Sequence, residues 1–122
     1  MSNNNSALMI EWGMPIEGRE TKALEEFMTH AAWWTQLKEA GKISDFRIYG
    51  PLVGNIQDRA GFVILEGTDK QIHELQSSEE FRSNLNRVII VGHNVAVTTL
   101  ETGDAMTTRM QRYGKSLKER LG

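Results

Sequence analysis

The stretch Gly61-Phe62-Val63-Ile64-Leu65-Glu66-Gly67-Thr68-Asp69-Lys70-Gln71 joins a strand to a helix and decides most of the fold. Residues 62–65 are apolar at every position, which is typical of a central strand covered on both faces of a sheet. Thr68 and Gln71 have the spacing of a capping box, in which each side chain bonds a backbone N–H of the other residue at a helix start. The sequence therefore predicts a strand over 61–66 and a helix that begins directly after Thr68.

A second capping signal, Ser77-Ser78-Glu79-Glu80, follows shortly after the first. Two helix starts so close together predict a helix that breaks near Ser77 and then resumes up to Gly92. Residues 95–100, Val-Ala-Val-Thr-Thr-Leu, are rich in β-branched side chains and predict the last strand. The resumed helix is expected to bury Phe81, Leu85, Val88 and Ile89.

Upstream, apolar residues alternate with others from Leu8 to Met14, the period of a strand, and Pro15 ends it. Residues 19–40 have helical periodicity and stop at Gly41, and residues 45–49 form another strand. The apolar side of the helix carries Ala23, Phe27, His30, Ala31, Trp34 and Leu37, while Glu20, Glu25, Glu26 and Glu39 are expected on its flanks and back.

The order of elements is strand, helix, strand, strand, helix, strand, followed by a tail helix. This order predicts an α+β fold of the ferredoxin-like βαββαβ type, with a four-stranded antiparallel sheet and two helices on one face. Both sides of the strands carry apolar residues, so a second subunit is expected to cover the open sheet face as a homodimer. The predicted parts are a disordered N-terminus over 1–6, one domain over 7–103 and a basic amphipathic helix over 104–122.

The charge is unevenly distributed along the chain, whose net charge is −2. Residues 104–122 contain five basic and two acidic side chains, a balance of +3, which leaves −5 for residues 1–103. The apolar stripe of the tail is narrow and lacks Trp and Phe, so the tail is not expected to bind a membrane. It is expected to dock onto the acidic body or across the dimer. The stripe consists of Met106, Met110, Tyr113, Leu117 and Leu121.

Composition excludes several classes of function. The chain has no cysteine, which rules out disulfides, thiol nucleophiles and iron–sulfur clusters and fits a cytoplasmic location. No signal peptide or membrane-spanning stretch is expected. Gly61-Phe62-Val63 matches part of an RNA-recognition strand, but Ala60 and Leu65 stand where stacking rings are needed, so no nucleic-acid partner is expected.

The lengths of the elements and the residues that begin and end them, over about residues 7–101, resemble those of the dimeric α/β-barrel superfamily. This superfamily includes antibiotic-biosynthesis-monooxygenase-like and muconolactone-isomerase-like families. The segments that carry the resemblance are Gly18-Arg19-Glu20, residues 34–43, Ser78-Glu79-Glu80-Phe81 and Gly92-His93-Asn94-Val95. The resemblance implies a homodimer and a cleft between helices and sheet that takes an aromatic or oxidised organic molecule. The Asn-Trp-His set of the haem-degrading and quinone-forming members is not carried over, because Glu11 stands near the position of the Asn.

Two residues are candidate proton acceptors. His30 lies on the buried side of the first helix, where the alternative is a core-edge histidine satisfied by backbone groups or water. Glu11 lies mid-strand, where burial favours a usable base and the alternative is a cross-strand pair with Arg47. No two of the three histidines have the spacing of a metal site, so neither a metal nor a cofactor is expected.

Three further residues are candidate ligand contacts. Arg47 and Tyr49 share one face of their strand and together suit a carboxylate or phenolate, although an exposed strand face explains them as well. Trp33 and Trp34 are adjacent in a helix, so Trp34 is expected in the core and Trp33 at the edge of the stripe. At that edge an aromatic ring can cover a ligand or a partner subunit.

These residues leave two classes of function open. The protein is either a cofactor-free oxygenase or isomerase acting on an aromatic or oxidised organic compound, or a non-catalytic ligand-binding or assembly module. Catalysis requires Glu11 or His30 to line an open cavity beside a second polar group. A filled apolar cleft with both residues paired to protein favours the module.

Overall fold

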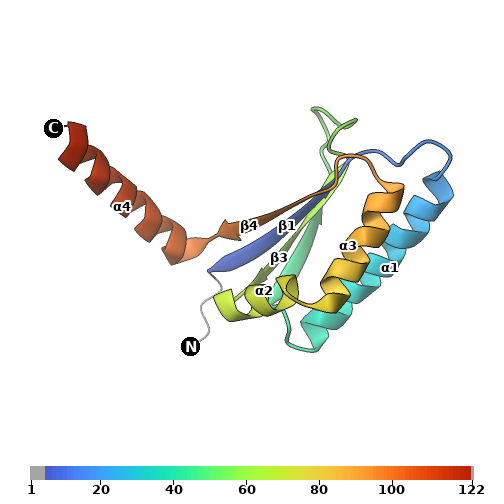
Figure 1. Ribbon diagram of the computed structural model, residues 1–122, viewed down its shortest axis with the longest axis horizontal. Coiled ribbons are helices and arrows are strands. Elements are labelled where there is room, and N and C mark those ends of the chain that lie inside the picture. The colour runs from blue at the N-terminus through green and yellow to red at the C-terminus, as the bar shows by residue number, and fades with distance from the viewer. Residues whose placement is uncertain (1–4, 122) are drawn as a thin grey trace.

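A computed structural model describes residues 5–121 as a four-stranded antiparallel sheet with two long helices on one face and a fourth helix that projects away (Figure 1). The sheet order is β2-β3-β1-β4, the ferredoxin-like arrangement predicted from the order of elements. The strands are β1 (Ser6–Trp12), β2 (Asp45–Tyr49), β3 (Gly61–Gly67) and β4 (Ala96–Glu101), and the helices are α1 (Glu20–Glu39), α2 (Asp69–Gln76), α3 (Glu79–Val91) and α4 (Gly103–Leu121).

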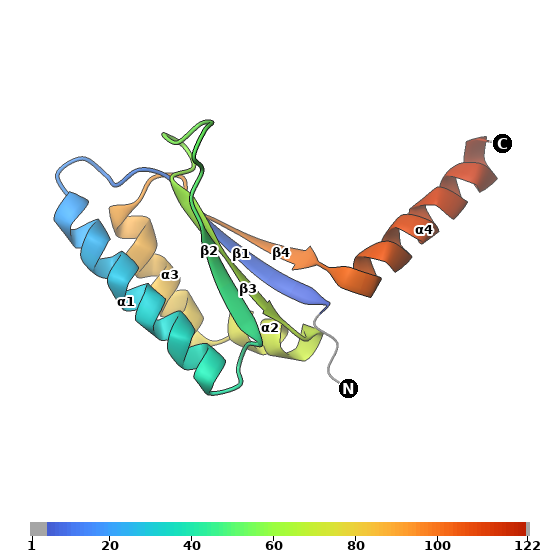
Figure 2. The ribbon, with the colours of Figure 1, turned by 180° about the vertical axis from the view of Figure 1, so that it is seen from behind.

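The register of the sheet separates its two faces. Ile10 of β1 lies between Val63 of β3 and Val97 of β4, and this row faces α1 and α3. The next residue, Glu11, lies between Phe62 and Ala96 and faces the opposite side. We call that opposite side, which neither long helix covers, the open face (Figure 2).

The core lies between the sheet and the two long helices. Leu8, Val63 and Leu65 are completely buried from the sheet side. From α1, Trp34 packs its ring against Trp12 and Phe46 at centroid distances of 6.3 and 6.1 Å. These rings fill the layer between helix and sheet, so the aromatic residues of α1 fix its distance from the strands.

The predicted break in the second helix is confirmed. Thr68 and Gln71 form both hydrogen bonds of the capping box at the start of α2. The Ser78 hydroxyl, one residue later than the expected break, accepts the Phe81 N–H and starts α3. The break between α2 and α3 changes the direction of the chain, so that α3 lies alongside α1.

The first strand ends two residues earlier than its alternation predicts. Gly13 and Met14 leave the ladder, and their N–H groups donate to the carbonyls of His93 and Gln57 at 2.7 and 3.2 Å. A Cβ on Gly13 would lie 2.9 Å from the Asp58 carbonyl oxygen, so only glycine fits this close approach of three loops. The loops therefore meet at the end of β1, beside the cavity described below.

The ends of the domain differ in part from the sequence-based expectation. Residues 1–4 of the predicted disordered N-terminus lie outside the described residues, whereas Ser6 already belongs to β1 and its hydroxyl donates to Asp69. The tail helix forms as predicted, but α4 buries none of its residues against its own domain. Docking onto the body of the same subunit is therefore not seen, and docking across the dimer stays a prediction.

Candidate functional site

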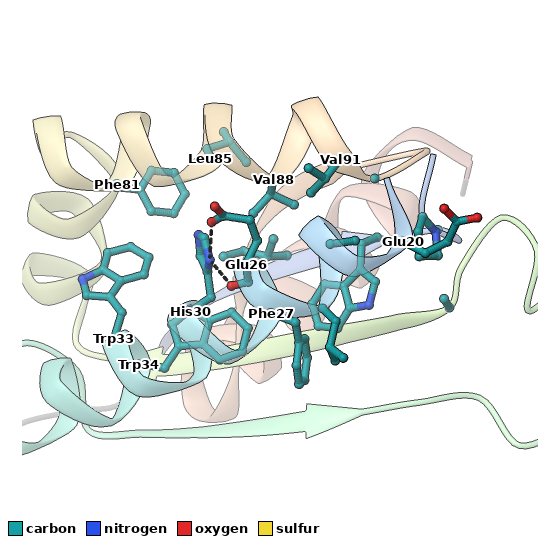
Figure 3. Close-up of a pocket in the computed structure, with 18 residues that line it drawn as sticks. Glu20, Glu26, Phe27, His30, Trp33, Trp34, Phe81, Leu85, Val88 and Val91 are labelled. Atoms are coloured by element: carbon teal, nitrogen blue, oxygen red, sulfur yellow. Dashed lines mark hydrogen bonds and ion pairs between the residues drawn. The ribbon is translucent and has the colours of Figure 1, made fainter. Parts of the chain in front are cut away.

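A cavity of about 250 Å³ opens between α1, α3 and the sheet, at the end of β1 (Figure 3). Aromatic and aliphatic side chains form most of its wall, and its few polar side chains come from α1. The lining residues are Ile10, Trp12, Gly13, Pro15, Glu20, Ala23, Leu24, Glu26, Phe27, His30, Trp33, Trp34, Ala60, Phe81, Leu85, Val88, Val91 and Gly92.

Glu26 is the buried carboxylate of this cavity, with 5% of its surface exposed. Figure 3 shows its side chain reaching from α1 toward Leu85 and Val88 of α3. There its Oε1 accepts two hydrogen bonds from Arg87, from Nε at 3.2 Å and from Nη2 at 2.9 Å. The expectation that Glu26 lies on the flanks or back of the helix, away from its buried side, is wrong, because Arg87 offsets the cost of burying its charge.

The second oxygen of Glu26 has no hydrogen-bond partner among the described residues. The same is true of the indole Nε1 atoms of Trp33 and Trp34, which line the same cavity. Buried polar atoms are nearly always satisfied in folded proteins, so three unsatisfied ones around a single cavity are unusual. Surrounding protein atoms cover all three, so a bound molecule or water satisfies one of them only after a side-chain shift exposes it.

His30 lines the cavity, but both of its ring nitrogens face the protein. Nδ1 lies 2.7 Å from the backbone carbonyl oxygen of Glu26, and Nε2 lies 3.2 Å from that of Asn84. A neutral imidazole has one N–H and can donate to only one of them. Oε2 of the Glu26 carboxylate also lies 3.8 Å from Nδ1. His30 therefore holds α1, α3 and the carboxylate together.

Trp33 and Trp34 are both buried, with 7% and 2% of their surfaces exposed. The expectation that Trp33 stays at the edge of the stripe is wrong. Phe81 of α3 covers its ring at 6.5 Å, so α1 is enclosed by the sheet on one side and α3 on the other. A helix held between two partners buries a wider sector than a stripe on one side.

Glu11 lies on the open face, separated from the cavity by the sheet itself. Its carboxylate pairs with Arg59 of the β2–β3 loop, Nε to Oε1 at 2.5 Å, and the expected pair with Arg47 does not form. Strand β3 lies between the strands of Glu11 and Arg47, so these two strands are about 10 Å apart, and Arg47 is offset by two further residues along the strand. A second, polar hollow surrounds Glu11 and Arg59.

Arg47 and Tyr49 also lie on the open face, on the edge strand β2. The Tyr49 ring stacks on Phe62 at 5.0 Å, and both residues of β2 are exposed. The structure thus brings His30 and Trp33 together in the cavity and leaves Glu11, Arg47 and Tyr49 on the opposite side of the sheet. The five sequence-based candidates belong to two separate places.

Two surface carboxylates have shifted pKa values, and neither lines the cavity. A backbone hydrogen bond and the His93 ring lower the pKa of Glu17, and the Lys38 ammonium and the Phe46 N–H lower that of Asp45. Within residues 5–121 no three His, Cys, Asp or Glu side chains gather as a metal site would require. No helix in that range combines the length and apolar character needed to cross a bilayer.

Gly61 supports the wall of the cavity. A Cβ at this position would lie 2.8 Å from Cζ2 of the Trp12 indole. Gly61→Ala is expected to displace the ring and lower the free energy of unfolding by about 1–3 kcal/mol, as overpacking does. Urea unfolding followed by Trp fluorescence measures both effects. Gly50→Ala is the control, since its Cβ would meet nothing closer than 3.8 Å, and equal stability of the two variants would contradict the argument.

Solved structures with this arrangement of strands and helices are known. The chain has the ferredoxin-like fold. A dimeric protein of unknown function and ferredoxin-like fold from Bacteroides fragilis matches with a TM-score of 0.62 at 7% identity, covering 84% of this chain and 100% of that chain. An ethyl tert-butyl ether D (EthD) family protein from Bacillus halodurans matches with a TM-score of 0.60 at 12% identity, with the same coverage.

A third structure, from Bacteroides thetaiotaomicron, is described as a possible oxidoreductase. It matches with a TM-score of 0.55 at 12% identity over 82% of this chain and 100% of that chain. At these identities the likeness shows the fold alone, and the narrower resemblance to monooxygenase-like and isomerase-like families stays a prediction. No protein-family model matches the chain, and no curated protein sequence does.

Proposed function

We propose that this protein binds a small, largely apolar organic molecule in the cavity between α1, α3 and the sheet. The observation that carries the proposal is the buried Glu26 carboxylate: its Oε2 has no hydrogen-bond partner in the described part of the chain, only the His30 ring 3.8 Å away, although the residue lines an apolar cavity. Leaving a buried charged acceptor unsatisfied costs free energy that a ligand donor recovers. Surrounding atoms cover Oε2, so binding includes a small turn of the carboxylate about its soft terminal torsion.

The chemistry of the wall defines the ligand. Rings of Trp12, Phe27 and Trp34 suit a planar apolar body. Glu26 and Glu20 at the same cavity disfavour an anionic ligand, so the ligand is uncharged and carries a hydroxyl, enol or N–H donor for Glu26. A volume of about 250 Å³ lies just below the usual range for drug-sized ligands, so the molecule is small.

Glu26 gives the site the means for acid–base chemistry without a cofactor. As a proton acceptor it takes a proton from an acidic C–H or O–H of the ligand and leaves the electron pair on the ligand as an enolate or phenolate. Return of the proton to another carbon completes an isomerisation with all atoms conserved. Alternatively the anion reacts with dioxygen, which is then the second substrate, and this begins an oxygenation. Arg87 and His30 hold the carboxylate in place for either outcome.

Non-catalytic ligand binding is the second candidate, and one observation favours it. Each ring nitrogen of His30 faces a backbone carbonyl of the protein and Glu11 is paired with Arg59, so neither predicted base points freely into the cavity. Only Glu26 then distinguishes an enzyme from a binding protein.

The proposal includes a homodimer formed through the open face. Met9, Phe62 and Ile64 lie there and are half-buried in the single chain, which leaves apolar surface for a partner. The similar structures from Bacteroides fragilis, Jannaschia and Thermobifida fusca are described as dimeric, which supports this part. The lack of cysteine supports a cytoplasmic location.

A thermal-shift screen tests ligand binding directly. The panel pairs small aromatic phenols, quinols and enolisable lactones with their O-methylated counterparts, which lack the donor, and adds aromatic acids. The unmethylated compounds are expected to raise the Tm by several degrees at concentrations well above their Kd, because ligands that bind only the folded state stabilise it. Equal shifts for methylated and unmethylated members, or no shift for any compound, would contradict the proposed role of Glu26.

A further inference from the structure

Helix α4 has an apolar stripe that residues 5–121 of its own subunit leave uncovered. None of its residues is buried, and the large side chains of the stripe are all exposed: Met106, Met110, Tyr113, Leu117 and Leu121. Helices gain most of their stability in water from packing an apolar face rather than from propensity. Gly114 in the middle lowers that propensity further. The helix therefore needs a surface to pack on.

The position of α4 points to the side on which that surface lies. Figures 1 and 2 show α4 leaving the end of β4 on the side of the sheet away from α1 and α3, and diverging from the sheet. The Thr102 N–H donates to the Asn5 carbonyl at 2.9 Å, and Gly103 turns the chain with a φ of 58°. Over its 19 residues the helix extends about 28 Å, well beyond the sheet.

A second copy seated on the open face would lie beside α4. The same side of the sheet carries the apolar residues that the proposed homodimer covers, and α4 projects on that side. Among the described residues, the ion pair that joins α4 to its own domain is the loose one between Arg109 and Glu101, whose charged atoms are 3.9 Å apart. Charge therefore ties the helix only weakly to its own subunit.

The distribution of charge along the chain also favours a second copy of this chain as the partner of α4. The segment from Asp104 onward has a net charge of +3, whereas the rest of the chain has −5. Another copy of this chain therefore offers an acidic body to a basic helix, and the complementary arrangement repeats in the opposite direction across a two-fold axis.

We propose that α4 is an arm that packs its apolar stripe onto the acidic body of a second copy of this chain and so clasps the homodimer. The inference rests on the proposed homodimer and adds a second area of contact to the open face. The exchange is reciprocal, since each subunit donates one arm and receives one.

Sedimentation equilibrium of the full chain and two double variants tests the arm. Met110→Gln with Leu117→Gln removes the centre of the stripe without changing charge or helix propensity greatly. We expect it to raise the dimer Kd by at least about 30-fold, since two large apolar side chains leave an interface. Thr108→Gln with Ser116→Gln, at positions of α4 outside the stripe, is the matched control and is expected to leave the Kd within a factor of about two.

Isotope-mixed cross-linking locates the arm. Equal amounts of 14N and 15N chains are mixed, and a zero-length carbodiimide joins Lys115 or Lys118 to nearby carboxylates. Cross-links from α4 to body carboxylates that appear in mixed-isotope pairs support the arm, and cross-links confined to single-isotope pairs overturn it. A stable dimer whose Kd the stripe variant leaves unchanged also overturns the arm but keeps the homodimer. A full chain that is monomeric at all concentrations overturns both.

Discussion

Glu26→Gln is expected to weaken binding of hydroxyl-bearing ligands about 10- to 100-fold, the value of a hydrogen bond to a charged acceptor. If a ligand is turned over, kcat is expected to fall by about 10²- to 10⁴-fold, because the amide cannot accept a proton. The substitution keeps the shape of the side chain, and its carbonyl can still accept from Arg87. Isothermal titration with the best ligand of the thermal-shift screen measures the affinity.

The same variant also changes the preference of the site. The introduced side-chain amide places N–H donors where the carboxylate oxygen lacked a partner, so O-methylated ligands with an acceptor gain relative to hydroxylated ones. Glu25→Gln is the matched control, because Glu25 is the preceding residue of α1 and its carboxylate is exposed beside Lys22. Glu11→Gln tests the open face. If Glu11→Gln lowers the affinity and Glu26→Gln does not, the site lies on the other side of the sheet.

The elements of the fold can be predicted from the sequence because their signals are local. The capping box of Thr68 and Gln71 depends on residues three apart, and the structure forms both of its hydrogen bonds. The strand over 45–49 begins and ends at the predicted residues. The end of β1 escapes prediction because the loops around Gly13 take over its hydrogen bonds, and those loops come from distant parts of the chain.

The candidate site can be predicted only in part, since its chemistry depends on contacts between elements. His30 is recognisable because it stands on the apolar side of α1. Glu26 cannot be recognised from the sequence, because its burial depends on Arg87 of α3. No regular spacing along the sequence predicts that ion pair. One signal is present: Glu26 and His30 are four residues apart and therefore share a side of the helix.

The open face shows the same limit in a different way. The alternation within each strand correctly places Arg47 and Tyr49 on one face of β2, whereas Glu11, expected mid-strand, is the second-last residue of β1. Strand order alone decides that β3 separates Glu11 from Arg47, and a loop residue, Arg59, then becomes the partner. Pairings within one strand are therefore predictable from the sequence, whereas pairings across strands need the topology.

Trp34→Ala is expected to lower the free energy of unfolding by about 3–5 kcal/mol, the usual cost of removing a buried aromatic ring. Only 2% of Trp34 is exposed, and its ring contacts the rings of Trp12, Phe27, His30 and Phe46 at centroid distances of 6.1 to 6.4 Å. Because small domains are stable by only about 5–15 kcal/mol, this single change removes a large share of the total. Urea unfolding followed by circular dichroism measures it.

The control for this prediction is Leu24→Ala, on the same helix but with 64% of the residue's surface exposed. It is expected to change the free energy of unfolding by less than about 0.5 kcal/mol. Trp34→Phe keeps an aromatic ring in the cluster and is expected to fall between the two. Since Trp34 is part of the cavity wall, its removal enlarges the site and also weakens ligand binding. If Trp34→Ala were no less stable than Leu24→Ala, the aromatic cluster would not be what holds α1 against the sheet, and the cavity built on that contact would lose its support.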